Sequence, residues 1–147
     1  MSYLIMRGHH WPDKIVLCMA NVGTLEFTSR DVHLGKYSRR GELEALAFNM
    51  LKWSSGKLPW ETEAELKNYD AVEIQKIKFL NDVPKLFTEC YGETPPCPGL
   101  GQFFNYIQRL GFAKTPKYSY IRQFLHKSLL RAGFDNDGKL DIINATC

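Results

Sequence analysis

The chain has 147 residues, of which 44% are hydrophobic and 13% aromatic, and this composition suffices for one domain with a substantial core. Its net charge of +3 is mild, so neither nucleic acid nor an acidic membrane is required as a partner, and no stretch approaches the ~20 apolar residues of a membrane span. The four cysteines show no Cys-x-x-Cys spacing and no convincing signal peptide precedes them, which predicts reduced thiols in an intracellular protein.

Residues 1–22 carry few structural signals. Residues 15–19 could form one short strand. His9, His10 and Cys18 could in principle bind a metal, but no second ligand pair has the spacing of a zinc site. We therefore expect no metal site in this part of the chain.

Residues 23–35 are predicted to form a loop. Gly23 and Gly35 suit turn geometry, and the hydroxyl groups of Thr24, Thr28 and Ser29 can bond to nearby backbone groups.

The strongest helical signal runs from Ser38 to Trp60. Ser38 is the predicted N-cap, Gly56 the predicted end, and Pro59 prevents a quick restart. The apolar residues cover more than one side, with Leu43, Leu46, Ala47, Met50 and Leu51 on one face and Ala45, Phe48 and Trp53 on the others. This pattern predicts a central helix with neighbours all round.

Three further helical stretches follow. Residues 71–91 are amphipathic, and Pro84 should split them into two helices. A helix around residues 103–110 should end at Gly111, and a last helix over residues 118–130 should stop at Gly133, with Ile121, Phe124, Leu125 and Leu129 inward. The chain is therefore predicted to be mainly α.

Residues 135–141 (DNDGKLD) have the acidic, glycine-containing composition of a calcium-binding loop. With Gly138 as the sixth residue of an EF-hand, the first and twelfth positions hold Gly133 and Asn144, so both anchoring acids are missing. An Asx-type turn is the better interpretation.

Several of these stretches together resemble one family. Residues 38–44 (SRRGELE), followed by residues 51–61 (LKWSSGKLPWE), resemble the central helix of the vaccinia-related kinases, which are relatives of casein kinase one. Residues 23–29 (GTLEFTS) resemble the end of their activation segment, and residues 118–122 and 137–141 resemble their last helix and the segment after it. The resemblance implies a kinase C-terminal-lobe-like domain over residues 23–147, with helices packed around one buried central helix, and leaves residues 1–22 unmatched.

The resemblance also implies roles for individual residues. In this family Gly23, Thr24 and Phe27 would bind the protein substrate, since the matching segment cradles the substrate chain. Asp31 falls where most kinases carry the Glu of Ala-Pro-Glu, and Arg122 matches its usual partner, which implies a buried structural ion pair. Two solvated surface charges are the alternative. Glu42 stands where relatives usually have Asp, and we interpret it as a first-turn acid favoured by the helix dipole.

The family transfers the γ-phosphate of ATP to a protein Ser or Thr, with Mg²⁺ and ATP bound by motifs that these residues do not contain. The 147 residues include no Gly-x-Gly-x-x-Gly, no His-Arg-Asp and no Asp-Phe-Gly, so we expect no catalytic, cofactor or metal residue here and no independent activity. The chain is expected to be a C-terminal lobe fragment of such a serine/threonine kinase. The alternatives are a pseudokinase-like, non-catalytic module that binds a protein partner, and an unrelated helical scaffold.

The resemblance implies residence in the nucleus or cytoplasm and a protein substrate or partner, without membrane. Self-association is a further expectation, because the side of the central helix with Ala45 and Phe48 should lack cover and form an exposed apolar patch.

Overall fold

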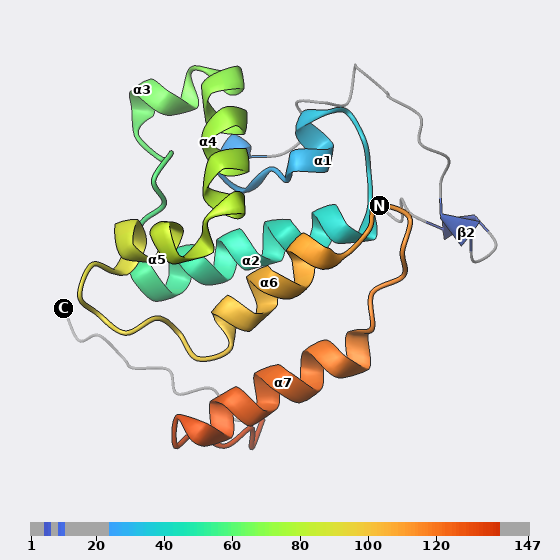
Figure 1. Ribbon diagram of the computed structural model, residues 1–147, viewed down its shortest axis with the longest axis vertical. Coiled ribbons are helices and arrows are strands. Elements are labelled where there is room, and N and C mark those ends of the chain that lie inside the picture. The colour runs from blue at the N-terminus through green and yellow to red at the C-terminus, as the bar shows by residue number, and fades with distance from the viewer. Residues whose placement is uncertain (1–4, 7–8, 11–23, 139–147) are drawn as a thin grey trace.

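The computed structural model describes residues 5–6, 9–10 and 24–138 (Figure 1). Its short strands β1 (Ile5–Met6) and β2 (His9–His10) pair antiparallel, with Ile5 opposite His10 and Met6 opposite His9. The remaining elements are the 3₁₀ helix η2 (Leu25–Phe27) and the helices α1 (Arg30–His33), α2 (Arg39–Ser55), α3 (Glu63–Leu66), α4 (Tyr69–Asn81), α5 (Val83–Tyr91), α6 (Leu100–Arg109) and α7 (Tyr118–Arg131). The fold is mainly α, as predicted. None of the described helices is both long and apolar enough to span a membrane.

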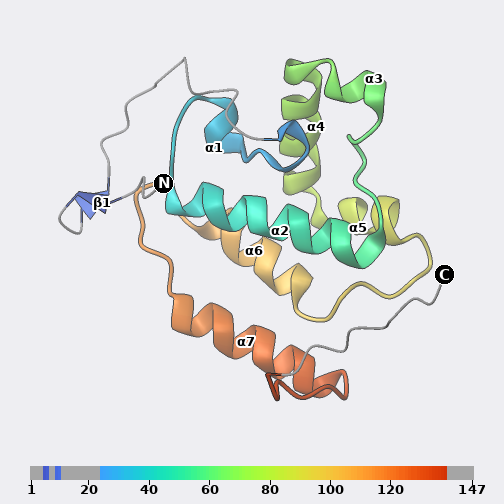
Figure 2. The same ribbon diagram turned by 180° about the vertical axis from the view of Figure 1, so that it is seen from behind.

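The long helix α2 runs through the middle of the fold, with α6 along one side and α4 and α5 on another (Figures 1 and 2). Its predicted start and end are both confirmed. The Ser38 hydroxyl accepts a hydrogen bond from the Gly41 backbone N–H at 2.8 Å. Gly56 ends the helix in the left-handed conformation at φ 81°, which costs glycine little because it has no Cβ.

The side of α2 with Ala45 and Phe48 was predicted to lack cover, and that prediction was wrong, because Phe48 is fully buried and Ala45 is half-buried. Phe48 has no exposed surface, and its ring lies 5.1 Å from the Trp60 ring and 6.1 Å from the Phe104 ring, between centroids. Leu46 and Trp53, by contrast, are 42% and 73% exposed. The cover comes from Trp60, in the loop just after α2, and from α6, which lies some fifty residues after Phe48 in the sequence.

The later helices follow the predicted boundaries closely. The break between α4 and α5 falls at Asp82, whose side chain caps α5 by accepting from the Lys85 N–H at 3.1 Å, with Pro84 in the first turn. In α7, Ile121 and Phe124 are buried as expected, but Leu125 is only half-buried and Leu129 is exposed, so the prediction was wrong for Leu129. Residues 24–35, predicted as a loop, instead contain η2 and α1, because the Ser29 hydroxyl caps α1 by accepting from the Val32 N–H.

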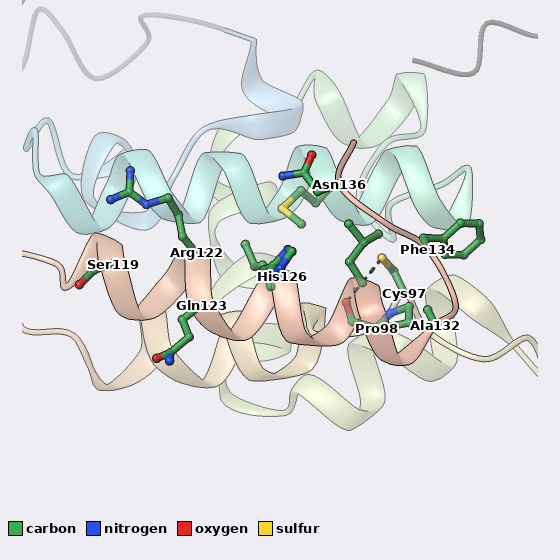
Figure 3. A pocket seen from close by; sticks show the side chains of 12 residues that line it. Cys97, Pro98, Ser119, Arg122, Gln123, His126, Ala132, Phe134 and Asn136 are labelled. Atoms are coloured by element: carbon green, nitrogen blue, oxygen red, sulfur yellow. Dashed lines mark hydrogen bonds between the residues drawn. The ribbon is translucent and has the colours of Figure 1, made fainter. Parts of the chain in front are cut away.

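An open groove lies between α2 and α7 (Figure 3). It encloses about 840 Å³, and apolar side chains contribute most of its lining. Met50 from α2 and Leu125 and Leu129 from α7 line it together with Phe134. Leu46 and Trp53 stand one helical turn before and after Met50 and extend the apolar surface along α2. We call Leu46, Met50 and Trp53 the α2 stripe.

We expect the α2 stripe to bind hydrophobic dyes and to promote self-association. Changing Leu46 and Trp53 together to Ser should lower dye fluorescence at least about twofold and shift the chain toward monomer, because contiguous exposed apolar surface drives both effects. Ile74→Ser is the matched control, since Ile74 is also strongly exposed but lies on α4. Dye binding and sedimentation that do not change in the double variant would contradict the prediction.

Candidate functional site

Residues 24–35, which we call the anchored segment, pack against α2 and α4 (Figure 1). They include η2, α1 and two of the predicted substrate-binding residues. Thr24 is exposed at the start of the segment, and Phe27 is half-buried against the core. Gly23, the third predicted residue, lies outside the described residues.

Lys76 of α4 is the main anchor of this segment. Its side chain is fully buried, yet its ammonium group reaches two backbone carbonyls, at 2.6 Å from the Leu25 oxygen and 2.8 Å from the Thr28 oxygen. The Nε2 atom of His33 lies 3.5 Å away and provides a third acceptor. A lysine ammonium has three N–H donors, so each donor has an acceptor within the same short segment.

Aromatic rings complete the surroundings of Lys76. Its Nζ atom lies 5.4 Å from the ring centroid of Phe48 and 5.4 Å from that of Trp60, within the range of cation–π attraction. Burial lowers the pKa of Lys76 to about 7, against the opposing effect of the carboxylates of Glu44 and Glu26. A neutral amine still has two N–H donors, so both carbonyl bonds persist in either protonation state.

His33 is neutral at physiological pH. Burial, and secondarily the charge of Lys76, lowers its pKa to about 4. When Lys76 is charged, Nε2 must accept, so the imidazole proton resides on Nδ1, which has no hydrogen-bond partner among the described residues.

Two further backbone carbonyls of the anchored segment also accept hydrogen bonds from side chains. The Trp60 indole N–H donates to the Glu26 carbonyl at 2.9 Å, and the Thr28 hydroxyl donates to the Thr24 carbonyl at 3.1 Å. With the two bonds from Lys76, every backbone carbonyl in residues 24–28 except that of Phe27 accepts a hydrogen bond from a side chain. The anchored segment is therefore fixed by tertiary contacts from Lys76 and Trp60 in addition to its local hydrogen bonds.

A buried ion pair fixes α1 to α2. Glu44 of α2 is 1% exposed, and its carboxylate accepts from the Arg30 backbone N–H at 2.8 Å and from Arg30 Nε at 2.9 Å. Burial raises the pKa of Glu44, and Arg30 opposes that shift. The arrangement satisfies both oxygens of the carboxylate, as a buried charge requires.

Asp31 has a different partner from the one predicted. Its buried carboxylate accepts from the Ser38 hydroxyl and from the guanidinium of Arg40, with 3.1 Å to Nε. Arg122 is exposed on α7, where it lines the groove facing α2 (Figure 3). The predicted Asp31–Arg122 pair is thus corrected to Asp31–Arg40, because the first turn of α2 places Ser38 and Arg40 directly beside α1.

Sequence reasoning missed Lys76 and Glu44, although a signal for Lys76 was present. Val72, Lys76 and Leu80 recur at four-residue intervals, so Lys76 stands in the apolar stripe of its own helix. A lysine in such a position is either a surface residue at the edge of the stripe or a buried cation with partners. No group of three or more His, Cys, Asp or Glu side chains that could hold a metal ion occurs in the described part of the chain.

Comparison with known proteins places the sequence of this chain among protein kinases. The chain is 33% identical over 119 residues to nucleosomal histone kinase 1 of Drosophila melanogaster, covering 81% of this chain and 20% of that protein. It is 35% identical over 105 residues to the serine/threonine-protein kinase VRK2 of Homo sapiens, covering 71% of this chain and 20% of that protein. It is 38% identical over 126 residues to the B1 kinase of variola virus, covering 85% of this chain and 41% of that protein.

The chain thus spans between a fifth and about two fifths of the length of these curated relatives. No family model matches it.

Proposed function

The chain belongs to the vaccinia-related kinase family as a C-terminal lobe, and we propose that it supplies the surface on which a protein substrate docks for phosphorylation at Ser or Thr. The anchored segment carries this proposal. Thr24 and Phe27 stand at its start, and the resemblance gives these positions to substrate binding. Side chains from α4 and from the loop after α2 donate to the backbone carbonyls around them. Such pre-organisation suits a reaction whose catalysis consists mostly of positioning.

The proposed activity requires groups beyond those in the 147 residues. Phosphoryl transfer needs a phosphate-covering loop, a lysine for the phosphates and acidic or amide ligands for Mg²⁺, and the sequence contains none of the motifs that supply them. We therefore propose that this chain alone is inactive as a kinase. That same observation favours a second candidate, in which the lobe acts as a pseudokinase-like module that holds a protein partner without catalysis.

The test combines two titrations of the same chain. Calorimetry should detect no Mg–ATP binding in the micromolar range. A degenerate peptide library centred on Ser or Thr should shift backbone amide resonances of residues 24–28 more than others in an isotope-labelled sample. Phe27→Ala should weaken that effect severalfold, whereas Leu130→Ala, an exposed change on α7, should not.

Tight, magnesium-dependent ATP binding would overturn the proposed inactivity of the chain alone. Peptide-induced shifts confined to another face would overturn the docking role of residues 24–28. Peptide docking without ATP binding agrees with both candidate functions. A second assay then distinguishes them, because only a substrate-docking lobe should have its bound peptides phosphorylated when a longer kinase chain is supplied.

A further inference from the structure

The net positive charge of this chain comes from one stretch that lacks acidic residues. From Thr94 to Phe134 the sequence contains six Lys or Arg residues and no Asp or Glu, whereas the rest of the chain has thirteen Lys or Arg against sixteen Asp or Glu. The mild net charge of the whole chain conceals this asymmetry. The stretch comprises α6, α7 and the linker between them (Figure 1), so one part of the surface is electropositive.

Half of these cations surround one cavity. Arg109 at the end of α6 and Lys114 and Lys117 in the linker line a pocket of about 670 Å³. All three are exposed, and no carboxylate is paired with any of them among the described residues. The remaining lining adds neutral hydrogen-bonding groups, namely Gln102, Asn105, Tyr106, Thr115 and Tyr120.

The backbone that presents these cations is held by the core. The Tyr106 hydroxyl accepts from the Lys117 backbone N–H at 2.7 Å, and Arg40 Nη1 donates to the Leu110 carbonyl at 3.3 Å. Arg39 is only 7% exposed and donates to the Thr115 hydroxyl at 3.2 Å, so a further positive charge lies behind the pocket wall. The cavity is therefore formed before a ligand arrives, which lowers the entropy cost of binding.

We propose that this pocket binds a phosphate group carried by a phosphorylated segment of a protein. A phosphoserine or phosphothreonine carries a charge near −2 and three strong acceptor oxygens, which matches several cations and neutral donors around one concavity. A single carboxylate has less charge and fewer acceptors. A nucleic-acid strand presents its phosphates in a row and calls for a track of cations, whereas these three cations gather at one cavity.

The test uses a fluorescent Gly/Ser peptide with one phosphothreonine and its unphosphorylated twin, each titrated with the full chain. We expect the phosphopeptide to bind at least about tenfold more tightly than the twin, and inorganic phosphate to compete. Changing Lys114 and Lys117 together to Ala should weaken binding about tenfold or more without altering the melting temperature, since both side chains are exposed.

The matched control changes Lys127 and Arg131 together to Ala. Both belong to the same basic stretch and remove the same charge, but neither lines the pocket. Equal weakening by the two double variants would overturn the proposal, because it would indicate a diffuse charge effect. Equal binding of the phosphorylated and unphosphorylated peptides would overturn it, and so would tighter binding of a single-stranded DNA 12-mer through Lys114 and Lys117.

Discussion

Replacing Lys76 by Met should lower the free energy of unfolding by about 2–4 kcal/mol at pH 8. Met fills a similar volume, but it leaves the Thr28 carbonyl without its side-chain donor and the Leu25 carbonyl with only the Thr28 N–H, and an unsatisfied buried acceptor costs about 1–3 kcal/mol. The variant also avoids the cost of deprotonating this amine on folding at pH 8, which offsets part of that loss. Urea unfolding measures the change, and hydrogen exchange should show faster opening of the anchored segment than of α6.

Lys78→Met is the matched control, because Lys78 lies on the same helix two residues later and is exposed. It should change stability by less than about 0.5 kcal/mol. If Lys76→Met leaves exchange in residues 24–35 unchanged, then the contacts of Trp60 and Glu44 hold the segment without Lys76.

The effect of Lys76→Met should also depend on pH. The pKa of Lys76 is about 7 in the folded chain and near its ordinary value of about 10.4 when unfolded. Between about pH 7 and pH 10 the unfolded chain binds more protons at this site, so the stability of the unmodified chain rises with pH there, by up to about 1.4 kcal/mol per unit. The Met variant lacks this rise, and its deficit should therefore be larger at pH 9 than at pH 6. His33 adds a rise of the same sign, between about pH 4 and its unfolded value near 6.5.

Local chemistry made the helix ends predictable. The N-cap at Ser38, the left-handed Gly56 and the break before Pro84 each depend on residues within one or two turns. The faces of α2 were not predictable in that way. The apolar pattern of a helix indicates which of its side chains are candidates for burial, but it does not identify their neighbours. Phe48 packs against Trp60 and Phe104, and the position of neither ring follows from the periodicity of α2.

The residues of the candidate site were assigned by resemblance, whereas the side chains that hold the anchored segment in place were not predicted. Thr24 and Phe27 lie on the anchored segment, but the cation that holds it comes from α4, some fifty residues later. The predicted partner of Asp31 failed for a related reason. The resemblance assigned the role of ion-pair partner to Arg122, but the guanidinium of Arg40, at the start of α2, already pairs with the carboxylate of Asp31.

Arg40→Ala should therefore destabilise the chain by about 3–5 kcal/mol, whereas Arg122→Ala should cost less than about 0.5 kcal/mol. Removing Arg40 leaves the carboxylate of Asp31, which is 3% exposed, with only the Ser38 hydroxyl as a side-chain donor among the described residues. Arg122 is exposed and has no ionic partner in the part of the chain that the structure describes.

A double variant separates the lost interaction from the charge left behind. Changing Asp31 to Asn and Arg40 to Met should recover part of the stability lost in Arg40→Ala, because no buried carboxylate then remains unpaired. Thermal or urea unfolding of the four proteins gives the comparison. A larger loss from Arg122→Ala than from Arg40→Ala would contradict the pairing seen here and restore the one that the resemblance implied. Arg40→Ala should cause the larger loss of stability because its removal leaves a buried carboxylate without a charged partner, whereas Arg122 is exposed.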